Sequence, residues 1–494
     1  MSKNINKVAN GLYVSRRRFI RATISSGIAA SLASHYPVLA FGTTPLSLEL
    51  KATPGRVRIV PEPYNKTDAW CYNNSVPGPE IRVTQGDRLK VEFDNGLDEE
   101  TTVHWHGIRL PNAMDGVPHL TQKPIFPEEK FTYEFDAVDA GTFWYHPHQR
   151  GSEQVGRGLY GALIVEEKDP LQVDRDVVWV LDDWRLKRSA EISGDFENPH
   201  DMSHNGRIGN TVSINGKIPD VFEVRTNERI RLRLINSANA RIFGLDFGSL
   251  SPVIIALDGQ PVTPHTPDDN LVILGPGMRA DLILDMTDRP DSQNTINDVF
   301  YQGREYALID IKYGSFRIRK DVPDWSVELP PNPLAEPDFV NAEHHEILFT
   351  GGMMGQMVEQ KMGVKSKSDN NSGNNIGSMM GMMHEKNMWF INGIAADGHI
   401  TNPLLVLKKD RSYVFKMINA TAWHHPIHLH GHSFRVISRD GVPTPYREWQ
   451  DTVLMNPQER VEIAFVADNP GDWMFHCHIL EHMAAGMMGV MRVV

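Results

Sequence analysis

Five His-x-His pairs constrain the fold of this chain more than any other feature of its sequence. Its 494 residues include 21 histidines, and a chance arrangement of these would give about one such pair. The pairs occupy the N-terminal third and the C-terminal fifth: His104/His106, His146/His148, His428/His430, His430/His432 and His476/His478. On a β-strand, residues i and i+2 point to the same face. Four converging pairs would bring eight imidazoles into one pocket, which is enough to hold several metal ions.

The last pair flanks Cys477, one of two cysteines in the chain. If His476–His478 is a strand, its alternation places Cys477 on one face and both histidines on the other. A thiolate with two imidazoles and a weak thioether is the blue-copper electron-transfer arrangement, and Met487 follows closely in the sequence. Two metal sites would then be joined by a short path for electrons. The alternative interpretation of Cys477 is a buried core cysteine or half of a disulfide.

The sequences around these residues resemble the copper signatures of the multicopper oxidases. The motifs are H-W-H-G, H-P-H, H-P-I-H-L-H-G and H-C-H-x-x-x-H-x-x-x-x-M, in the order of that family and across nearly the whole mature chain. The resemblance implies an all-β fold of three cupredoxin-like Greek-key β-sandwich domains. Short strand signals punctuated by Gly, Pro and Asn, without long helical periodicity, also favour β-sandwiches.

The resemblance further implies four copper ions, namely one of type 1, one of type 2 and two of type 3. The ligands that it implies are His425, Cys477 and His482 with axial Met487 for type 1; His104 and His428 for type 2; His106, His146 and His478 for one type 3 ion; and His148, His430 and His476 for the other. His424 and His432 have no counterpart among the ligands. We interpret them as surface histidines or as neighbours of ligands.

The N-terminal residues 1–40 are interpreted as a twin-arginine signal peptide. The segment SRRRFI at 15–20 resembles the export motif, a weakly apolar stretch follows at 24–33, and Val-Leu-Ala at 38–40 is typical of a cleavage site. We therefore expect the twin-arginine machinery to export the protein to the periplasm. The alternative is a disordered basic tail. No later segment reaches the ~18 apolar residues of a membrane helix, so no stable membrane insertion is expected.

The net charge limits the classes of partner that the chain can bind, and the cysteine count bears on whether a disulfide can form. Without residues 1–40 the chain has 44 basic and 62 acidic residues, a net charge near −18. This charge repels nucleic acid and anionic lipid, and it favours the approach of cationic substrates. Because Cys477 is assigned to copper, Cys71 is expected to be a free buried thiol.

We expect cupredoxin domain 1 at 46–167, domain 2 at 173–313 and domain 3 at 343–494. Domain 2 has no His-x-His pair and no cysteine, so we interpret it as a copper-free spacer. Its turns at 258–261 and 275–281, and Asp-Thr-Val at 451–453, are interpreted as structural. The similarity of residues 232–236 to residues 414–419 hints at internal duplication.

A methionine-rich insert at 351–388 interrupts domain 3. It contains nine methionines around a Ser/Asn/Lys-rich stretch, 365–375, that we expect to be disordered. Thioethers suit Cu(I), which suggests a cuprous-ion relay, while a flexible hydrophobic lid is the alternative. The insert resembles that of copper-efflux oxidases. Those enzymes place an acid and a Met before the H-P-x-H-x-H motif, whereas residues 421–424 here are Thr-Ala-Trp-His.

The resemblance implies an enzyme that couples one-electron oxidation of a small reductant, Cu(I), Fe(II) or a phenol, to four-electron reduction of O₂ to water, with a role in copper tolerance. Asp115 stands where the family has an acid near the cluster, so we expect it to deliver protons; the alternative is an ordinary turn aspartate before glycine. Many relatives have a second acid directly after the last type 1 histidine. Met483 occupies that position here, so Glu481 is the remaining candidate. Two other classes of protein are considered. One is a periplasmic copper-binding or storage protein without turnover, and the other is a copper-free scaffold.

Overall fold

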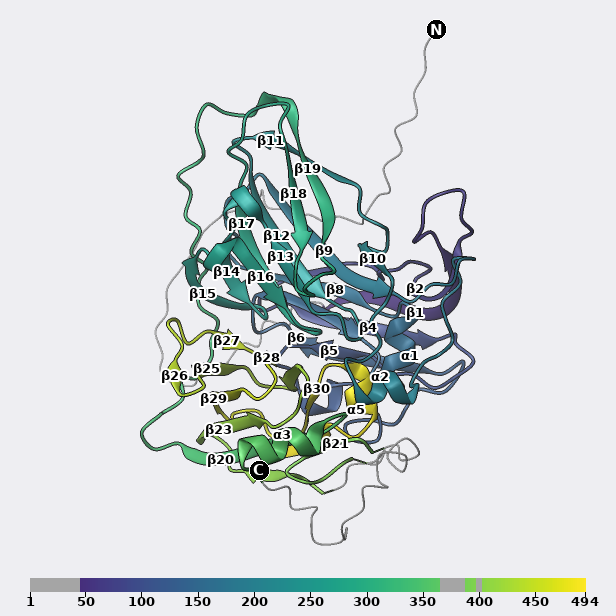
Figure 1. Cartoon of the computed structure of the whole chain (residues 1–494), viewed down its shortest axis with the longest axis vertical. Helices are drawn as coiled ribbons and strands as arrows, with labels where there is room; N and C mark the ends of the chain where they lie inside the picture. The colour runs from purple at the N-terminus through teal and green to yellow at the C-terminus, as the bar shows by residue number, and fades with distance from the viewer. Residues whose placement is uncertain (1–44, 365–386, 397–401) are drawn as a thin grey trace, which may run out of the picture. The chain divides into compact units, whose positions relative to one another are not determined.

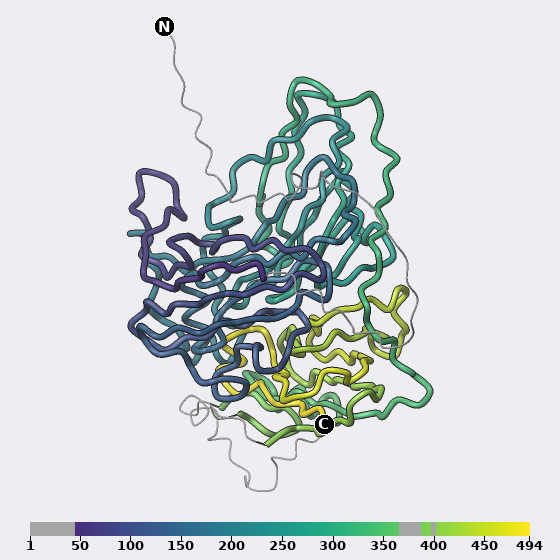
Figure 2. The backbone as a smooth tube through the Cα atoms, turned by 180° about the vertical axis from the view of Figure 1, so that it is seen from behind, coloured from purple at the N-terminus to yellow at the C-terminus, as the bar shows by residue number. Residues whose placement is uncertain are grey.

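The computed structural model describes residues 45–364, 387–396 and 402–494, which all belong to one compact unit from Thr43 to Val494. Strands form most of its regular structure (Figures 1 and 2). The expected signal peptide at 1–40 and the stretch at 365–375 lie outside the described residues. Within the described part, no helix has the length and apolar character needed to cross a bilayer. The all-β fold is confirmed.

The first stretch of chain, 46–166, forms two four-stranded sheets. One sheet has the order β2 (Thr67–Tyr72), β1 (Leu46–Val57), β4 (Arg88–Asn95) and β6 (Lys130–Asp136); the other has the order β3 (Ile81–Thr84), β8 (Gly161–Glu166), β7 (Gly141–His146) and β5 (His104–His106). Strand β4 shows the alternation that builds the core. Leu89, Val91 and Phe93 are fully buried, while Glu92 between them faces solvent.

The middle stretch, 175–317, forms a six-stranded and a five-stranded sheet. The larger has the order β10 (Thr211–Ile214), β9 (Arg175–Trp184), β12 (Arg229–Asn236), β17 (Arg279–Asp285), β14 (Val253–Leu257) and β15 (Gln260–His265). The smaller has the order β11 (Val221–Thr226), β19 (Tyr306–Arg317), β18 (Gln293–Asp298), β13 (Phe243–Asp246) and β16 (Leu271–Leu274). A separate apolar core, which includes Leu232 and Leu282, fills this stretch.

The last stretch, 343–493, again forms two sheets. One has the order β21 (Trp389–Ile391), β20 (Glu343–Gly351), β23 (Ser412–Asn419), β29 (Arg460–Val466), β25 (Phe434–Arg439) and β26 (Val442–Pro443), with β27 (Trp449–Gln450) also paired to β25. The other has the order β22 (Leu405–Leu407), β31 (Met488–Val493), β30 (Gly471–Cys477), β24 (His425–Leu429) and β28 (Thr452–Met455). One apolar core joins this stretch to the first, and Trp105 and Phe475 both belong to it.

Helices are short. They are α1 (Gly151–Gly156), α2 (Pro199–Ser203), α3 (Gly355–Met362) and α5 (Leu480–Ala484), with 3₁₀ turns η1 (Asn112–Met114), η2 (Gly248–Leu250) and η3 (Asp268–Asn270). Helix α3 forms the start of the methionine-rich insert. Within the described residues of the insert, 351–364 and 387–388, the eight residues of α3 are helical.

The same turn ends one strand in each stretch. Strands β4, β12 and β23 each have one parallel and one antiparallel neighbour, and each ends in asparagine: Asn95, Asn236 and Asn419. Each asparagine Oδ1 accepts a hydrogen bond from the backbone N–H two residues on, at 3.0, 3.0 and 3.1 Å respectively. Such Asx turns satisfy a backbone donor where a strand ends. The repeated arrangement supports the internal duplication suggested by the sequence.

Candidate metal centre

Two pairs of neighbouring strands bring the histidine pairs together. In one sheet, β5 and β7 are antiparallel with His104 opposite His146. In another, β24 and β30 are antiparallel with His428 opposite His476. Because alternate residues share a face, each register places two pairs side by side. The predicted convergence of the pairs is therefore built from strand pairing.

Eight imidazoles form one buried cluster at the junction of the first and last stretches. All are at most 6% exposed: His104, His106, His146, His148, His428, His430, His476 and His478. Rings from the two stretches stack on one another, with centroids 4.0 Å apart for His104 and His430 and 3.9 Å apart for His106 and His428. The Nε2 atoms of His430 and His476 lie 3.0 Å apart.

Backbone carbonyls fix the tautomers of several of these rings. The Nδ1 atoms bond to carbonyl oxygens as follows: His104 to Asp115 at 2.7 Å, His146 to Pro147 at 3.0 Å, His428 to Asp451 at 2.8 Å and His476 to Cys477 at 2.9 Å. A carbonyl only accepts, so each Nδ1 carries the proton. Each Nε2 then presents its lone pair, as histidine ligands of metals commonly do.

The cluster has the donor set that a metal requires. Seven ring nitrogens of the cluster are buried without a protein partner: Nε2 of His104, His146, His148 and His428, Nδ1 of His106, and both nitrogens of His478. Burial, followed by the neighbouring imidazoles, lowers the pKa of His146, His148 and His478 well below the usual value. The rings are therefore neutral, as metal ligands must be. Leaving so many buried acceptors unpaired is costly, and copper would satisfy them.

The implied ligand sets can be compared with the clusters of donor atoms. His148, His430 and His476 have donor atoms within 4.8 Å of one another, and so do His104, His428 and His430. A third such group is His104, His106 and His146. The His478 ring lies 4.9 Å from that of His106 and 5.3 Å from that of His146. Each residue thus lies beside its expected partners, while the division among individual ions stays a prediction.

A second cluster lies on the other face of β30. The Sγ of Cys477 lies 3.4 Å from Nδ1 of His425 and 3.7 Å from Nδ1 of His482. The two Nδ1 atoms are 3.2 Å apart, and all three side chains are fully buried. Burial raises the pKa of the Cys477 thiol and lowers that of His482 to about 3. A bound metal would have to displace the thiol proton, which is what coordination does to a thiol.

Hydrogen bonds orient both imidazoles of this second cluster. The Thr421 hydroxyl donates to Asn419 Oδ1 at 2.7 Å, so its oxygen accepts from Nε2 of His425 at 2.9 Å. Nε2 of His482 donates to the carbonyl of His204 at 2.6 Å. Both Nδ1 lone pairs consequently face the sulfur. Sequence reasoning missed Thr421 and His204, and His204 had no signal at all because its backbone makes the contact.

Met487 is placed next to this cluster by the backbone. Its carbonyl accepts from the Cys477 N–H at 3.0 Å, and its N–H donates to the His482 carbonyl at 3.0 Å. The side chain is fully buried in the apolar core that also contains Cys477. Its role as the axial ligand stays a prediction that this position supports.

Trp389 is a further residue that the sequence analysis did not identify. Its buried ring centroid lies 4.2 Å from that of His482 and 5.0 Å from that of His425. Its Nε1 donates to the Met202 carbonyl at 2.6 Å. The indole therefore shields both imidazoles from water and ties the last stretch to the middle one.

The turns interpreted as structural also contact the histidines. Asp451 accepts two hydrogen bonds from Arg279 at 2.8 and 2.6 Å, and its carboxylate lies 3.3 Å from Nδ1 of His428. Gly277, at φ +85°, packs so closely that a Cβ would lie 2.8 Å from the His478 ring. The middle stretch contributes to the wall of the cluster, in addition to separating the other two stretches.

Asp115 lies in a turn before glycine and also contacts the imidazole cluster. Its turn depends on Gly116, at φ +80°, where a Cβ would lie 1.9 Å from the Val103 carbonyl. Its carboxylate is buried and accepts from Nδ1 of His430 at 2.9 Å. Glu481 is fully buried and accepts from the Arg207 N–H and the Asn239 amide, both at 3.0 Å. Burial raises the pKa of Glu481.

His424, His432 and Cys71 lie outside both clusters. His432 is buried and bonds through Nδ1 to the His430 carbonyl at 3.2 Å, and His424 is half-buried with its ring 5.3 Å from that of Phe300. Cys71 is a free buried thiol, as predicted, and burial raises its pKa to about 11.

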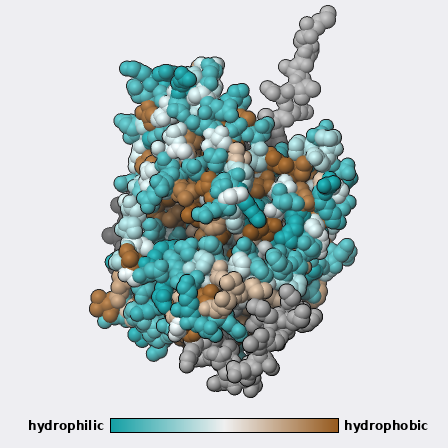
Figure 3. Space-filling model, in the orientation of Figure 1, coloured by the Kyte–Doolittle hydropathy of each residue, from teal (hydrophilic) through white to brown (hydrophobic). Residues whose placement is uncertain are grey.

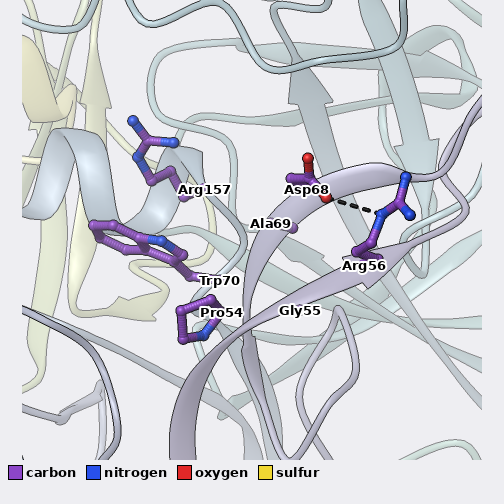
Figure 4. A pocket seen from close by; sticks show the side chains of 7 residues that line it. All are labelled: Pro54, Gly55, Arg56, Asp68, Ala69, Trp70 and Arg157. Atoms are coloured by element: carbon purple, nitrogen blue, oxygen red, sulfur yellow. Dashed lines mark ion pairs between the residues drawn. The ribbon is translucent and has the colours of Figure 1, made fainter.

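A surface pocket of about 320 Å³ lies over β1 and β2, away from the histidines (Figure 4). Its cations are already paired, Arg56 with Asp68 at 2.9 Å and Arg157 with Glu153 at 2.7 Å. It therefore offers no uncompensated charge to an anion. Hydrophilic residues cover most of the face in Figure 3, as expected for a strongly acidic chain.

A thiolate–imidazole cluster that shares a strand with an imidazole cluster, in an all-β fold, defines a copper redox protein. Models of the multicopper oxidase family match residues 55–170, 175–304 and 372–494. The solved multi-copper oxidase of Pseudomonas thermotolerans is 34% identical, with 91% of this chain and 99% of that chain covered and a TM-score of 0.78. The multicopper oxidase MmcO of Mycobacterium tuberculosis is 30% identical over 96% of this chain and 95% of that protein. Copper resistance protein A of Escherichia coli is 25% identical over 98% of this chain and 99% of that protein. The chain belongs to the multicopper oxidase family, and it is a copper-binding oxidoreductase.

Proposed function

We propose that this protein is an exported oxidase that protects against copper by oxidising Cu(I) with O₂. The observation that carries the proposal is the end of strand β30, where Cys477 faces one cluster while His476 and His478, the residue after the strand, face the other. Electrons taken at the first cluster have a path of one residue to the second. Phenols and Fe(II) are the alternative reductants. Four electrons and four protons reduce one O₂ to two waters.

Four copper ions are proposed, with the ligand sets given above. When bound, copper supplies the one-electron steps and the binding of O₂; the chain supplies geometry and protons. Thr421 and the His204 carbonyl aim two imidazoles at Cys477. The carboxylate of Asp115 accepts a hydrogen bond from His430. We propose that this buried acid delivers protons to the imidazole cluster.

The compartment and domain bounds are also proposals. The arginine motif at 15–20 supports export by the twin-arginine machinery to the periplasm. The three pairs of sheets support cupredoxin domains at 46–167, 173–313 and 343–494. A role in copper tolerance is supported by the methionine-rich insert and by the similarity to a relative named copper resistance protein A.

The test compares wild type with Cys477→Ser and with Cys71→Ala as the matched cysteine control. Steady-state O₂ consumption is measured with Cu(I), Fe(II) and a phenol, alongside the blue absorption. We expect Cys477→Ser to lose both the colour and turnover, because serine lacks the thiolate. Cys71→Ala should keep both. Turnover by Cys477→Ser would contradict the assignment of Cys477 as a metal ligand. A higher kcat/KM for phenol than for Cu(I) would contradict the assignment of Cu(I) as the substrate.

A further inference from the structure

Two histidines of the middle stretch lie directly above the thiolate–imidazole cluster. His200 and His204 are four residues apart at helix α2, and their rings are parallel, with centroids 4.2 Å apart and an interplanar angle of 9°. The His200 side chain is 78% exposed and His204 is half-buried. Neither belongs to the two clusters described above. Two histidines at i and i+4 on one face are a chelating arrangement for metal ions.

His204 is connected to the buried cluster through its own backbone. Its carbonyl accepts the hydrogen bond from Nε2 of His482 at 2.6 Å. Helix α2, which ends one residue before His204, and helix α5, which contains His482, lie side by side in Figure 1. An ion on the His204 ring would thus be connected to the His482 imidazole through the side chain and carbonyl of His204 and one hydrogen bond of 2.6 Å.

The tautomer of His204 leaves one ring nitrogen free to bind an ion. Nδ1 of His204 lies 2.9 Å from the His200 carbonyl, so it carries the proton and leaves the lone pair on Nε2. The nearest acid is Asp201, 3.8 Å from Nδ1 of His200. Chelation of one ion by both Nε2 atoms requires the His200 ring to turn out of the stack. Its exposure leaves it room to do so.

The methionine-rich insert begins against this pair. The Met353 N–H donates to the Ser203 carbonyl at 2.9 Å, and the Trp423 Nε1 donates to the Met353 carbonyl at 3.0 Å. The Trp423 ring centroid is 5.2 Å from that of His204. Met354, the next residue, is 49% exposed. Soft thioether and imidazole donors therefore occupy the same part of the surface.

We propose that His200 and His204 form the docking site for the reducing cation, a soft monovalent ion such as Cu(I). This inference rests on the proposed function. Residues 421–424, Thr-Ala-Trp-His, supply neither a carboxylate nor a thioether beside the cluster, so the imidazoles of α2 provide the donors instead. The docked Cu(I) loses one electron, which passes through His204 to the imidazole of His482 and is consumed in O₂ reduction. No covalent bond changes, and Cu(II) departs.

The first test measures binding without turnover, by titrating the holoenzyme with Ag(I), a redox-inert mimic of Cu(I). Wild type is compared with the double variant His200→Ala/His204→Ala and with His265→Ala. His265 is the matched control because its ring is likewise stacked, 4.1 Å from that of Tyr446. We expect the double variant to lose one tightly bound Ag(I) per chain, and His265→Ala to match wild type.

The second test is kcat/KM for Cu(I), which we expect to fall at least tenfold in the double variant. The single variant His200→Gln changes only the exposed histidine, so the contact between the rings of His204 and Trp423 remains. Unchanged Ag(I) stoichiometry and affinity in both variants would overturn the docking site, as would loss of that Ag(I) only in Met354→Leu/Met357→Leu. If wild type itself fails to oxidise Cu(I), the proposed function fails, while the Ag(I) titration still decides the site.

Discussion

At the scale of the residue, several of the clustered imidazoles are oriented by a hydrogen bond to one ring nitrogen. Carbonyls of Asp115 and Asp451 orient His104 and His428, and the carboxylate of Asp115 orients His430. Such partners fix the tautomer and raise the basicity of a ligand. Asp115 contacts His104 through its backbone carbonyl and His430 through its carboxylate, and Asp451 contacts His428 and His106 in the same way.

Substitution of Asp115 separates orientation from proton transfer. Asp115→Asn keeps an oxygen to accept from His430, so we expect copper content and the blue absorption to stay as in wild type. Re-oxidation of the reduced enzyme by O₂ should slow by about 10²–10⁴-fold, the usual contribution of a proton donor. Asp115→Ala should in addition weaken copper binding by about 10–100-fold. Stopped-flow re-oxidation and copper analysis measure both effects; wild-type re-oxidation in Asp115→Asn would leave only the orienting role.

At the scale of the element, the start of the insert is ordered and anchored. Strand β20 runs into helix α3, Met353 bonds to Ser203 and Trp423, and a Cβ on Gly352 would lie 2.0 Å from the Trp389 ring. The insert therefore begins beside the thiolate–imidazole cluster, on the side where a substrate would arrive. This placement suits both interpretations of the insert, a Cu(I) relay and a lid.

Replacing the insert distinguishes these interpretations. Exchange of residues 351–388 for a short Gly/Ser loop should sharply reduce Cu(I) oxidation and leave phenol oxidation unchanged or faster, because soft donors and a steric cover are removed together. Loop shortening changes closure entropy slowly, so the fold should survive. The matched variant exchanges only 354–387 and keeps Met353. O₂ consumption with each reductant is the measurement, and equal Cu(I) efficiency in all three proteins would exclude the relay.

At the scale of the whole molecule, partly exposed and buried ion pairs connect the three stretches. Asp176 on β9 accepts from Arg233 at 2.8 Å and lies 3.4 Å from Arg82 on β3. Burial alone would raise the pKa of Asp176, but the hydrogen bonds and charge of Arg233, with Arg231 and Arg82, lower it to about 2. Arg279 connects the middle stretch to Asp451 in the same way.

This lowered pKa predicts a pH-dependent contribution to stability. A carboxylate whose folded pKa is depressed stabilises the fold above its unfolded pKa near 4, and the contribution is lost as the pH falls through the folded pKa of about 2. Because solvent screens this partly exposed carboxylate, Asp176→Asn should cost at most about 2 kcal/mol at pH 7, with the difference from wild type shrinking between about pH 4 and pH 2.

Urea or thermal midpoints across this pH range provide the measurement. The matched control is Asp68→Asn, because the Asp68–Arg56 pair is 74% and 63% exposed. Exposed pairs contribute little, so this control should change stability by less than about 1 kcal/mol. A difference for Asp176→Asn that does not vary with pH would show that packing rather than charge is lost.

The sequence by itself determined the β-rich fold, the convergence of the histidine pairs and the two faces of Cys477. The convergence and the two faces follow from the two-residue period of a strand, in which residues i and i+2 lie on the same face. Free, buried Cys71 followed from assigning the other cysteine to copper.

Only the tertiary structure decided which groups surround those residues. The His204 carbonyl, Trp389, Thr421 and Arg279 reach the clusters from other strands and loops, and backbone groups carry no sequence signal. Domain 2 was expected to be a spacer, yet its α2 segment bonds to His482 and its Gly277 turn packs against His478. Contacts between distant parts of a chain depend on how packed sheets meet, and the local periodicity of a sequence does not encode that geometry.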